Sequence, residues 1–353
     1  MAKKRISVCI ITKNEEKNIR RCLECLKPYP FDIVVIDTGS TDNTKQVAQE
    51  LADRVYDFAW INDFSAARNF AASKARCDWI LAIDSDEFLE HLDLDELYRH
   101  MDAYPSSVGS IIQRNQIRPD DTTQTYRARV ARLYNKYYYA FTGSIHEQLN
   151  PFTGDEHSLF HTSLSVYHIG YALPEEENRQ KDIRNRDLLL KAIEADPENP
   201  YNYLQLAKTY DNLDENDLAL SYYQKGFSFD IDTERGYMNY MIVNYGKFLL
   251  RTNRFEEALG FESFYDTFCN TADFVYLMGQ IYSANNLPLK ALLQFIKATT
   301  MTEYSQDGVN SYLAYYRIGL IYAGIGNTEL AVTFLKKCGD WEPALQKIEE
   351  LEG

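Results

Sequence analysis

The chain has 353 residues, of which 45% are apolar, and carries a formal net charge of −15. This length indicates two domains rather than one. The acidic excess argues against a general nucleic-acid binder or an anionic-membrane binder, but it does not exclude a local basic pocket. No segment approaches the roughly 20 apolar residues of a membrane span. The apolar run at 6–11 is too short for a signal-peptide core. We therefore expect a cytoplasmic protein with no nucleic-acid partner and no transmembrane segment.

The first part of the chain, up to about residue 170, alternates apolar runs with amphipathic segments. This alternation predicts a mostly parallel sheet with helices on both faces. Beyond residue 111 the pattern becomes rich in strand-forming and aromatic residues. We expect strands at 6–11, 32–36, 55–58, 79–83, 130–134, 137–141 and 164–168, and helices at 14–26, 41–51 and 64–75.

The second part is helical and repeats itself after a charged helix at 175–194. Four small residues, each followed by an aromatic, recur at separations of 39, 33 and 40, and an alanine follows each one twelve positions later. This pattern resembles the tetratricopeptide repeat, in which small residues let paired helices pack closely. The long separations predict extended helices or insertions at 232–237 and 302–310. The alternative is an irregular helical bundle. The pairs are Ala207 and Ala219, Gly246 and Ala258, Gly279 and Ala291, and Gly319 and Ala331.

Six cysteines are too few and too scattered for a disulfide scaffold. Cys22 and Cys25 form a C-x-x-C pair inside an expected helix, with no second pair at zinc-finger spacing. We interpret them as buried structural thiols in a reducing compartment.

The segment with the clearest chemistry is Asp84-Ser85-Asp86, which ends the expected strand 79–83. Two acids at positions i and i+2 point the same way if the extended geometry persists. Carboxylates that converge at the end of a strand suit Mg²⁺ or Mn²⁺ with a phosphorylated ligand. The alternative is a solvated acidic turn that opens a helix.

Polar segments also follow the first two strands, Thr12 to Glu16 and Asp37 to Thr44. A strand, a glycine turn and a helix start leave backbone N–H groups free to bind a polar ligand. The alternative is an ordinary turn in which Ser40 or Thr41 caps the next helix. Arg68, in the helix before the Asp-x-Asp strand, can pair with a diphosphate or lie on a solvated helix face.

Taken together, the segments 7–16, 37–42, Arg68-Asn69 and 84–87 resemble the family 2 glycosyltransferases of the GT-A fold. The similarity is greatest to a subgroup with lipopolysaccharide-core glucosyltransferases and peptide glycosyltransferases that modify bacteriocin cysteines. The resemblance implies an α/β GT-A domain at 1–174, a helical linker at 175–198 and an all-α tetratricopeptide-like domain at 199–353. Many relatives have paired acids where this chain has Asp37-Thr38.

The resemblance also implies roles for individual residues. Asp86 is expected to hold Mn²⁺ or Mg²⁺, with Asp84 on the metal or the ribose, and His168 is a further candidate metal ligand or a structural strand residue. Glu147, in the segment His146-Glu147, corresponds to the carboxylate that deprotonates the acceptor. The nucleotide-sugar site is expected to comprise Thr12, Asn14, Glu15, Asp37, Gly39, Ser40, Asp42, Arg68, Asn69, Asp84 and Ser85.

The sequence does not decide the roles of several other charged residues. One of the strand arginines is expected to face the cleft. The basic residues of the linker helix can reach the diphosphate or form a solvated face. The remaining histidines are expected on the surface or in packing. These groups are Arg127, Arg129 and Arg132; Lys181, Arg184 and Arg186; and His91, His100, His157 and His161.

The sequence thus predicts an inverting, metal-dependent transfer of a sugar from a nucleotide-diphosphate sugar, most simply a UDP-sugar. Helical repeats build concave surfaces for extended chains, which favours a peptide or protein acceptor modified on Ser, Thr or Cys. Lipopolysaccharide or another cell-surface glycan is the alternative acceptor, and few exposed apolar residues on the repeats would favour the peptide. The repeats could instead form a homodimer. A non-catalytic scaffold with a degenerate transferase domain is the alternative of another class.

Overall fold

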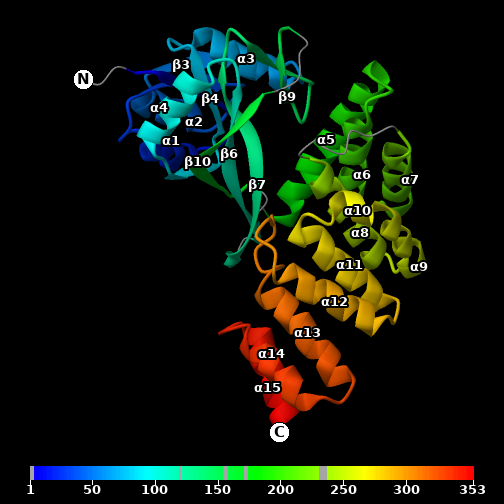
Figure 1. Cartoon of the computed structure of the whole chain (residues 1–353). Coiled ribbons are helices and arrows are strands. Elements are labelled where there is room, and N and C mark those ends of the chain that lie inside the picture. Colours follow the sequence, from blue (N-terminus) through cyan, green and yellow to red (C-terminus); the bar gives the residue numbers. More distant parts are fainter. Residues whose placement is uncertain (1–3, 119–120, 154–157, 171–173, 230–236) are drawn as a thin grey trace. The chain divides into compact units, whose positions relative to one another are not determined.

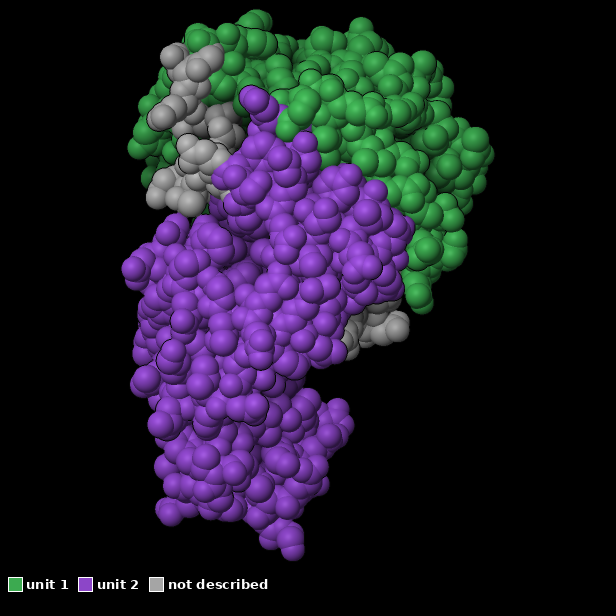
Figure 2. All heavy atoms as spheres, turned by 90° about the vertical axis from the view of Figure 1, so that its right-hand side faces the viewer, with its two compact units in different colours: residues 1–197 green, residues 198–353 purple. Residues whose placement is uncertain are grey.

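The computed structural model describes residues 4–118, 121–153, 158–170, 174–229 and 237–353. The chain divides into two compact units, residues 1–197 and 198–353, which are coloured separately in Figure 2. The division falls just after helix α5 (Glu175–Ala195), the charged segment that the sequence assigns to a linker. Each unit has its own architecture and is described by itself.

The first unit is built on an eight-stranded sheet in its described residues (Figure 1). Strands β3, β2, β1 and β4 are mutually parallel, β7 is antiparallel to β4 and β6, and β10 is parallel to β6 and antiparallel to β5. A separate two-stranded sheet pairs β8 (Tyr139–Thr142) with β9 (Gln148–Pro151). The large sheet has the order β3 (Arg54–Asp57), β2 (Phe31–Asp37), β1 (Ile6–Thr12), β4 (Trp79–Asp84), β7 (Asp121–Asn135), β6 (Val108–Arg118), β10 (Leu159–His168), β5 (Glu87–His91).

Side chains of the central strands are buried on both faces of this sheet. Val8 and Ile10 of β1 belong to one apolar cluster together with Leu23, whereas Cys9 between them belongs to a second cluster with Ala71. Because strand side chains alternate, this arrangement requires helices on both faces, as the sequence predicts. The first cluster includes residues of α1 (Ile19–Leu26), α2 (Thr44–Leu51) and α4 (Leu94–Ala103), and the second those of α3 (Phe64–Lys74).

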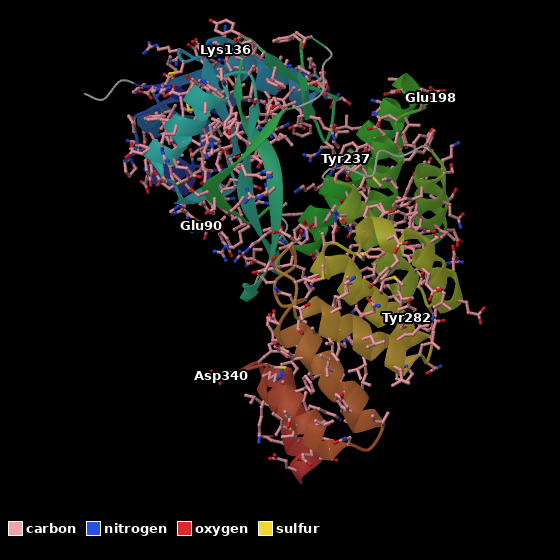
Figure 3. The ribbon with its side chains drawn as sticks, viewed as in Figure 1. Glu90, Lys136, Glu198, Tyr237, Tyr282 and Asp340 are labelled. Carbon is pink, nitrogen blue, oxygen red and sulfur yellow. The ribbon has the colours of Figure 1, made fainter. Side chains whose placement is uncertain are left out.

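The start expected for the first helix of this unit is wrong. The helix expected from residue 14 begins at Ile19, because Asn14 has a φ of 55° and the N–H of Asn18 closes a turn on the Glu15 carbonyl at 2.9 Å. Strand β5 and helix α4, which the sequence pattern does not predict, follow the Asp-x-Asp segment. Directly after the last residue of β7, the ammonium of Lys136, which is labelled in Figure 3, donates to the Ala75 carbonyl at 2.8 Å.

The second unit consists of helices in sequential pairs (Figure 1). The second helix of the second pair is broken, because a 3-10 segment at Leu259–Phe264 separates α9 from α10. No helix in the described part of the chain combines the length and apolarity that a membrane crossing requires. The helices are α6 (Pro200–Asn212), α7 (Asn216–Phe227), α8 (Met238–Arg251), α9 (Phe255–Ala258), α10 (Tyr265–Phe268), α11 (Ala272–Ala284), α12 (Pro288–Ala298), α13 (Tyr312–Gly324), α14 (Thr328–Lys336) and α15 (Glu342–Glu352).

The small residues of the repeat pattern lie where helices pack, as the sequence predicts. A Cβ on Gly279 would lie 2.6 Å from the ring of the buried Phe295, and one on Gly319 would lie 2.7 Å from Leu335. The insertion expected at 302–310 is a loop between α12 and α13. The one expected at 232–237 lies almost entirely outside the described residues. Between helix pairs, the Tyr282 hydroxyl donates to the Glu262 carboxylate at 2.9 Å (Figure 3).

Replacement of Gly279 by alanine tests this close packing. The new methyl group would press on a buried ring, so we expect the unit to lose about 2 kcal/mol of stability despite the better helix propensity of alanine. Gly324→Ala is the control, because a Cβ there meets nothing within 4 Å. Thermal unfolding followed by far-ultraviolet circular dichroism compares the two. Equal melting temperatures would show that the contact is not needed.

Candidate functional site

The carboxyl ends of three parallel strands form one edge of the sheet. The register pairs Thr12 of β1 with Asp37 of β2, and Ile11 of β1 with Asp84 of β4. The polar segments that follow these strands therefore lie side by side. In open α/β sheets, ligands bind at this edge.

Two buried polar atoms at this edge have no hydrogen-bond partner among the described residues. They are Oδ2 of Asp37 and Oγ1 of Thr12, on side chains that are 3% and 4% exposed. The other oxygen of Asp37 accepts from the N–H groups of Gly39 and Ser40, each at 3.0 Å, in a turn that Gly39 permits with a φ of 103°. Buried polar atoms without partners are costly and rare. Their adjacency indicates a site for a ligand with both donor and acceptor groups.

The loops after β1 and β2 are tied to each other. The Asn14 side-chain oxygen accepts from the Thr41 N–H at 2.8 Å, and the Asn14 N–H donates to Oγ of Ser40 at 3.0 Å. Asp42 accepts from the Thr44 N–H at 3.0 Å and from the Glu16 N–H at 3.3 Å. Neither Ser40 nor Thr41 caps α2, because that helix begins only at Thr44. Asn14, Ser40 and Asp42 thus shape the loops around the two unpaired atoms.

Glu15 lies between these loops and the Asp-x-Asp segment. Its carboxylate accepts from the Asn18 amide at 2.8 Å. Burial raises the pKa of Glu15, the Asn18 hydrogen bond opposes this, and the nearby charge of Asp86 adds to the rise. Glu15 therefore belongs to the same electrostatic site as Asp86.

A buried guanidinium joins the Asp-x-Asp strand to the loop that carries Glu147. Arg68 is 5% exposed, and its Nη2 lies 2.6 Å from Oδ1 of Asp84 while its Nε donates to Oε1 of Glu147. Arg132 binds the other oxygen of Asp84 at 2.9 Å. Burial alone would raise the pKa of Asp84, but Arg132 and Arg68 outweigh it and hold that pKa well below its usual range. Nη1 of Arg68 has no partner among the described residues.

The two acids of the Asp-x-Asp segment do not point the same way, which corrects the sequence expectation. Strand β4 ends at Asp84 and the chain turns at Ser85 and Asp86, so the extended geometry stops between them. The fully buried Glu87 fixes this turn by accepting from the Asp84 N–H at 2.8 Å. Burial raises the pKa of Glu87, and the charge of Asp84 adds to the rise. Asp84 thus faces the arginines, while Asp86 faces elsewhere.

Asp86 faces His168, the last residue of β10. Nε2 of His168 lies 3.3 Å from Oδ2 of Asp86, and Nδ1 lies 2.6 Å from Oδ1 of Asn115 on the neighbouring strand β6. The amide nitrogen of Asn115 donates to two carbonyls, so its oxygen accepts the Nδ1–H of the histidine. Burial lowers the pKa of His168, but Asp86 outweighs it and raises that pKa overall. In the neutral ring, Nε2 and Asp86 are therefore two acceptors that face each other.

A divalent cation fits between Asp86 and His168. Two adjacent ligands of an ion with bonds of about 2.1 Å lie about 3 Å apart, close to the 3.3 Å seen here. Asn115 orients the histidine through a hydrogen bond to its other ring nitrogen, as such hydrogen bonds orient metal-bound histidines. Within the described ranges, no group of three or more histidine, cysteine or carboxylate side chains is placed to hold a metal. Any ion would take its remaining ligands from water or a phosphate.

Gly170 gives the Asp86–His168 pair its room. A Cβ at this position would lie 2.3 Å from Oδ2 of Asp86 and 2.4 Å from Nε2 of His168. Only a residue without a side chain lets the backbone pass this close to the pair.

The loop that carries Glu147 is held on α3. The Asn69 side chain receives the Phe141 N–H at 3.0 Å and donates to the Phe141 carbonyl at 2.8 Å, as a neighbouring strand would. The Phe64 N–H, at the start of α3, donates to the Ser144 carbonyl at 2.9 Å. Asn69, expected near the diphosphate, therefore has its amide engaged in positioning β8.

The structure adds to the candidate site side chains that the sequence did not single out. Of the three strand arginines, Arg132 is the one that reaches the Asp84 cluster. Glu87, Asn115 and Gly170 support the two acids, and only the proximity of Glu87 to the Asp-x-Asp segment could have signalled it. Cys22 is buried as expected, and Cys25 is partly buried. His100 stacks on Phe160 and His161 bonds to Ser110, while His157 lies outside the described residues.

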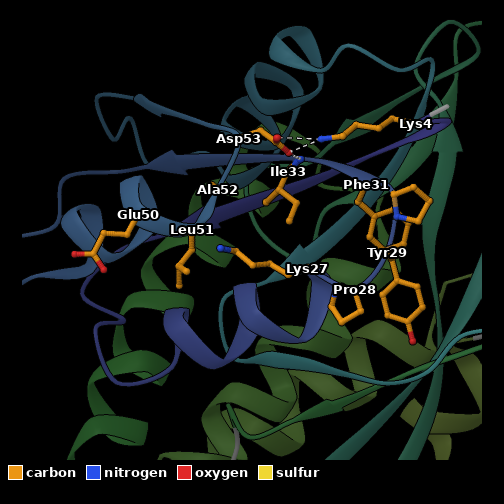
Figure 4. A pocket seen from close by; sticks show the side chains of 11 residues that line it. Lys4, Lys27, Pro28, Tyr29, Phe31, Ile33, Glu50, Leu51, Ala52 and Asp53 are labelled. Atoms are coloured by element: carbon orange, nitrogen blue, oxygen red, sulfur yellow. Dashed lines mark hydrogen bonds and ion pairs between the residues drawn. The ribbon is translucent and has the colours of Figure 1, made fainter. Parts of the chain in front are cut away.

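A hollow of about 740 Å³ lies at the opposite edge of the sheet (Figure 4). It is lined by residues around the starts of β1 and β2, including Lys4, Lys27 and Phe31, and an ion pair between Lys4 and Asp53 at 2.9 Å crosses it. None of the residues expected at the functional site lines it. The chemistry described above therefore lies elsewhere.

Comparisons with known proteins match different families in the earlier and the later part of the chain. Residues 7–164 match the model of glycosyl transferase family 2, and residues 188–221 and 312–345 match tetratricopeptide repeat models. Residues 7–164 are thus similar to family 2 glycosyltransferases, and the two later segments are similar to tetratricopeptide repeats.

Individual relatives share parts of this architecture. The chain is 34% identical over 129 residues to a TPR repeat-containing protein of Synechococcus elongatus, which covers 36% of this chain and 31% of that protein. It is 29% identical over 231 residues to the SPbeta prophage-derived glycosyltransferase SunS of Bacillus subtilis, which covers 63% and 53%. It thus spans about a third to a half of these curated relatives. Among solved structures, S. aureus TarS 1–349 is similar over 94% of this chain and 90% of that structure, at 16% identity and a TM-score of 0.36.

Arg68→Met tests the buried charge cluster. It leaves Asp84 and Glu147 without a shared partner, so we expect a loss of roughly 3–5 kcal/mol in the free energy of unfolding at pH 7. The lowered pKa of Asp84 stabilises the wild type above the unfolded value of about 4 and loses that effect as the pH falls below it.

The difference between wild type and Arg68→Met should therefore shrink below about pH 4. Urea unfolding at pH 7 and at pH 3.5 measures it, and the exposed Arg179→Met on α5 serves as the control. A difference in the free energy of unfolding that does not change with pH would contradict the ion-pair assignment.

Proposed function

We propose that this chain is an inverting glycosyltransferase that uses a nucleoside-diphosphate sugar, most simply a UDP-sugar. The proposal is carried by the adjacent unpaired atoms of Asp37 and Thr12 at the carboxyl edge of the sheet. A carboxylate oxygen accepts from an N–H donor such as the ring N–H of uracil, which the adenine ring lacks. The hydroxyl of Thr12 can donate or accept. The family match over residues 7–164 supports the same reading.

Charge at the site favours a metal-dependent reaction. Asp84 and Glu147 are compensated by arginines, but Asp86 and Glu15 add negative charge where a diphosphate would lie. We propose that Asp86 and His168 hold Mn²⁺ or Mg²⁺. Asp84 is not a ligand in this proposal, because both of its carboxylate oxygens bind arginines. Such an ion, when bound, supplies neutralisation of the charge on the leaving diphosphate.

Glu147 is the proposed general base. It is 11% exposed, and Arg68 holds one carboxylate oxygen in place. Among the described residues the other oxygen has no hydrogen bond, so it can take the proton of an attacking hydroxyl or thiol. One guanidinium thus orients both the base and Asp84.

We propose a peptide or protein acceptor for the repeats. Stacked repeats form extended concave binding surfaces. Within the described residues, the first helices of the pairs, α6, α8, α11 and α13, expose no large apolar side chain, which favours a polar chain over a lipid. A lipopolysaccharide or other surface glycan remains the alternative acceptor. The exposed residues lie on second helices, on α15 or after α13: Leu218, Leu289, Leu293, Ile296, Ile325, Leu330 and Leu345.

Two further expectations stay as proposals. The stripe of Leu289, Leu293 and Ile296 on α12 is the feature that favours a homodimer through the repeats. Light scattering of wild type and Leu293→Glu tests it, and identical masses would remove the idea.

We also propose a cytoplasmic location, on the six cysteines that form no disulfide. A non-catalytic scaffold is disfavoured, because it needs no unpaired buried atoms at the sheet edge.

A panel of nucleotide sugars tests donor and metal together. We expect release of UDP from a UDP-sugar with Mn²⁺ or Mg²⁺, and loss of at least tenfold in rate with EDTA or in Asp86→Asn, because the leaving charge is then uncompensated. Coupled detection of free nucleotide measures the rate. Undiminished release in EDTA would remove the metal, and no release from any donor would favour the scaffold.

Glu147→Gln tests the general base. The amide keeps the acceptor for Arg68 but cannot take a proton, so kcat should fall about 100-fold or more while UDP affinity changes little. Glu90→Gln on β5, which alters a partly exposed ion pair with Arg114 of β6, is the matched control. Equal turnover in the two variants would exclude Glu147 as the base.

A further inference from the structure

Helix α1 carries the C-x-x-C pair and lies against the stretch of chain that contains the Asp-x-Asp acids. Sγ of the fully buried Cys22 donates to the Asp84 carbonyl at 3.6 Å. One helical turn later, Sγ of Cys25 accepts from the Leu89 N–H at 3.2 Å. The two thiols therefore contact both ends of this stretch, and Asp86 lies between the two contacts.

The direction of each of these hydrogen bonds is fixed by its partners. A carbonyl oxygen only accepts, so Cys22 must keep its proton to bind Asp84. Cys25 donates its own proton to the Cys22 carbonyl at 3.0 Å, which leaves a sulfur lone pair for the Leu89 N–H. Burial raises the pKa of both thiols, so both stay protonated at neutral pH. The pair thus supplies one donor and one acceptor at fixed places.

Helix α1 also covers the outer edge of strand β5. This strand is the last in the order of the large sheet, so no further strand pairs with that edge among the described residues. Sγ of Cys25 takes the Leu89 N–H that a further strand would otherwise accept. The Arg21 guanidinium of the same helix lies 4.0 Å from the centre of the Phe88 ring, which is buried.

The position of β5 sets the distance between the two proposed cation ligands. His168 of β10 pairs with Glu87, the residue directly after Asp86. Only three consecutive register pairs hold this end of β5 to β10 before the register shifts between Ser165 and Val166. Because this ladder is short, the contacts from α1 supply restraint that the sheet alone does not.

We infer that Cys22 and Cys25 are positioning residues that hold Asp86 at the distance from His168 that the proposed cation requires. The inference rests on the proposed function and adds to it a role for the C-x-x-C pair. A binding site needs its ligands held within about 0.5 Å of the productive geometry. Two hydrogen bonds that bracket Asp86 from one rigid helix meet that need.

Mn²⁺ binding in the presence of UDP, measured from the electron paramagnetic resonance signal of the free ion, tests this role without turnover. Cys25→Ala removes the acceptor of the Leu89 N–H and should raise the Kd for Mn²⁺ about 10-fold, the low end of the range for residues that orient metal ligands. Cys25→Ser keeps a donor and an acceptor, so its Kd should stay within about threefold of wild type. Cys9→Ala is the matched control, because Cys9 is a buried thiol of β1 in the other apolar cluster, and its Kd should not change.

Thermal unfolding shows which variants fold. If Cys25→Ala does not fold, Arg21→Met takes its place, because Arg21 is exposed and its loss removes only the contact with Phe88. That variant should raise the Kd about threefold. Unchanged Mn²⁺ binding in the folded variant overturns the inference and leaves the proposed function standing.

Two other results also decide the question. If Cys25→Ser binds Mn²⁺ as weakly as Cys25→Ala, the hydrogen bond to Leu89 is not the cause and the inference is overturned. If wild type binds no Mn²⁺ in the presence of UDP, the proposed cation site fails and the inference falls with it.

Discussion

The buried guanidinium of Arg68 is the interaction on which the candidate site depends. A buried charge must be paired, and Arg68 is paired at once with Asp84 from β4 and Glu147 from the β8–β9 loop. The adjacent Asn69 binds the Phe141 backbone and so fixes the same loop from the same helix. The helix, the strand and the loop are therefore locked together by two consecutive side chains. The proposed base cannot shift without exposing a charge.

This constraint divides the work of the two acids. Asp84 is neutralised by Arg68 and Arg132, so it serves best as a fixed element of the site wall. Asp86, beyond the turn that Glu87 holds, lies against His168 instead. A site with this much carboxylate repels a free diphosphate, so it needs added cations. The cation proposed at Asp86 and His168 would meet this electrostatic requirement.

The sequence could predict what depends on periodicity and fails where backbone irregularities intervene. The alternation of strands and helices and the small residues of the repeats follow from local patterns, and the structure confirms both. A shared direction of Asp84 and Asp86 required an extended backbone, and a turn separates the two residues instead. Arg132 could not be chosen because it lies in a register shift, where Ala131 and Leu133 pair with Ser110 and Gly109. Such a bulge re-aims one side chain and has no periodic signature.

The donor half of the proposed reaction is better defined than the acceptor half for a physical reason. A nucleotide site is buried, and a buried polar atom without a hydrogen bond costs free energy. The unpaired atoms of Asp37 and Thr12 therefore indicate a missing partner. An acceptor surface on the repeats stays solvated, and water satisfies its polar groups. Its chemistry therefore leaves no unpaired atoms to read, only the absence of exposed apolar groups on the first helices in the described ranges. The proposed acceptor must be identified by binding experiments, whereas the proposed donor site can be tested at named buried residues.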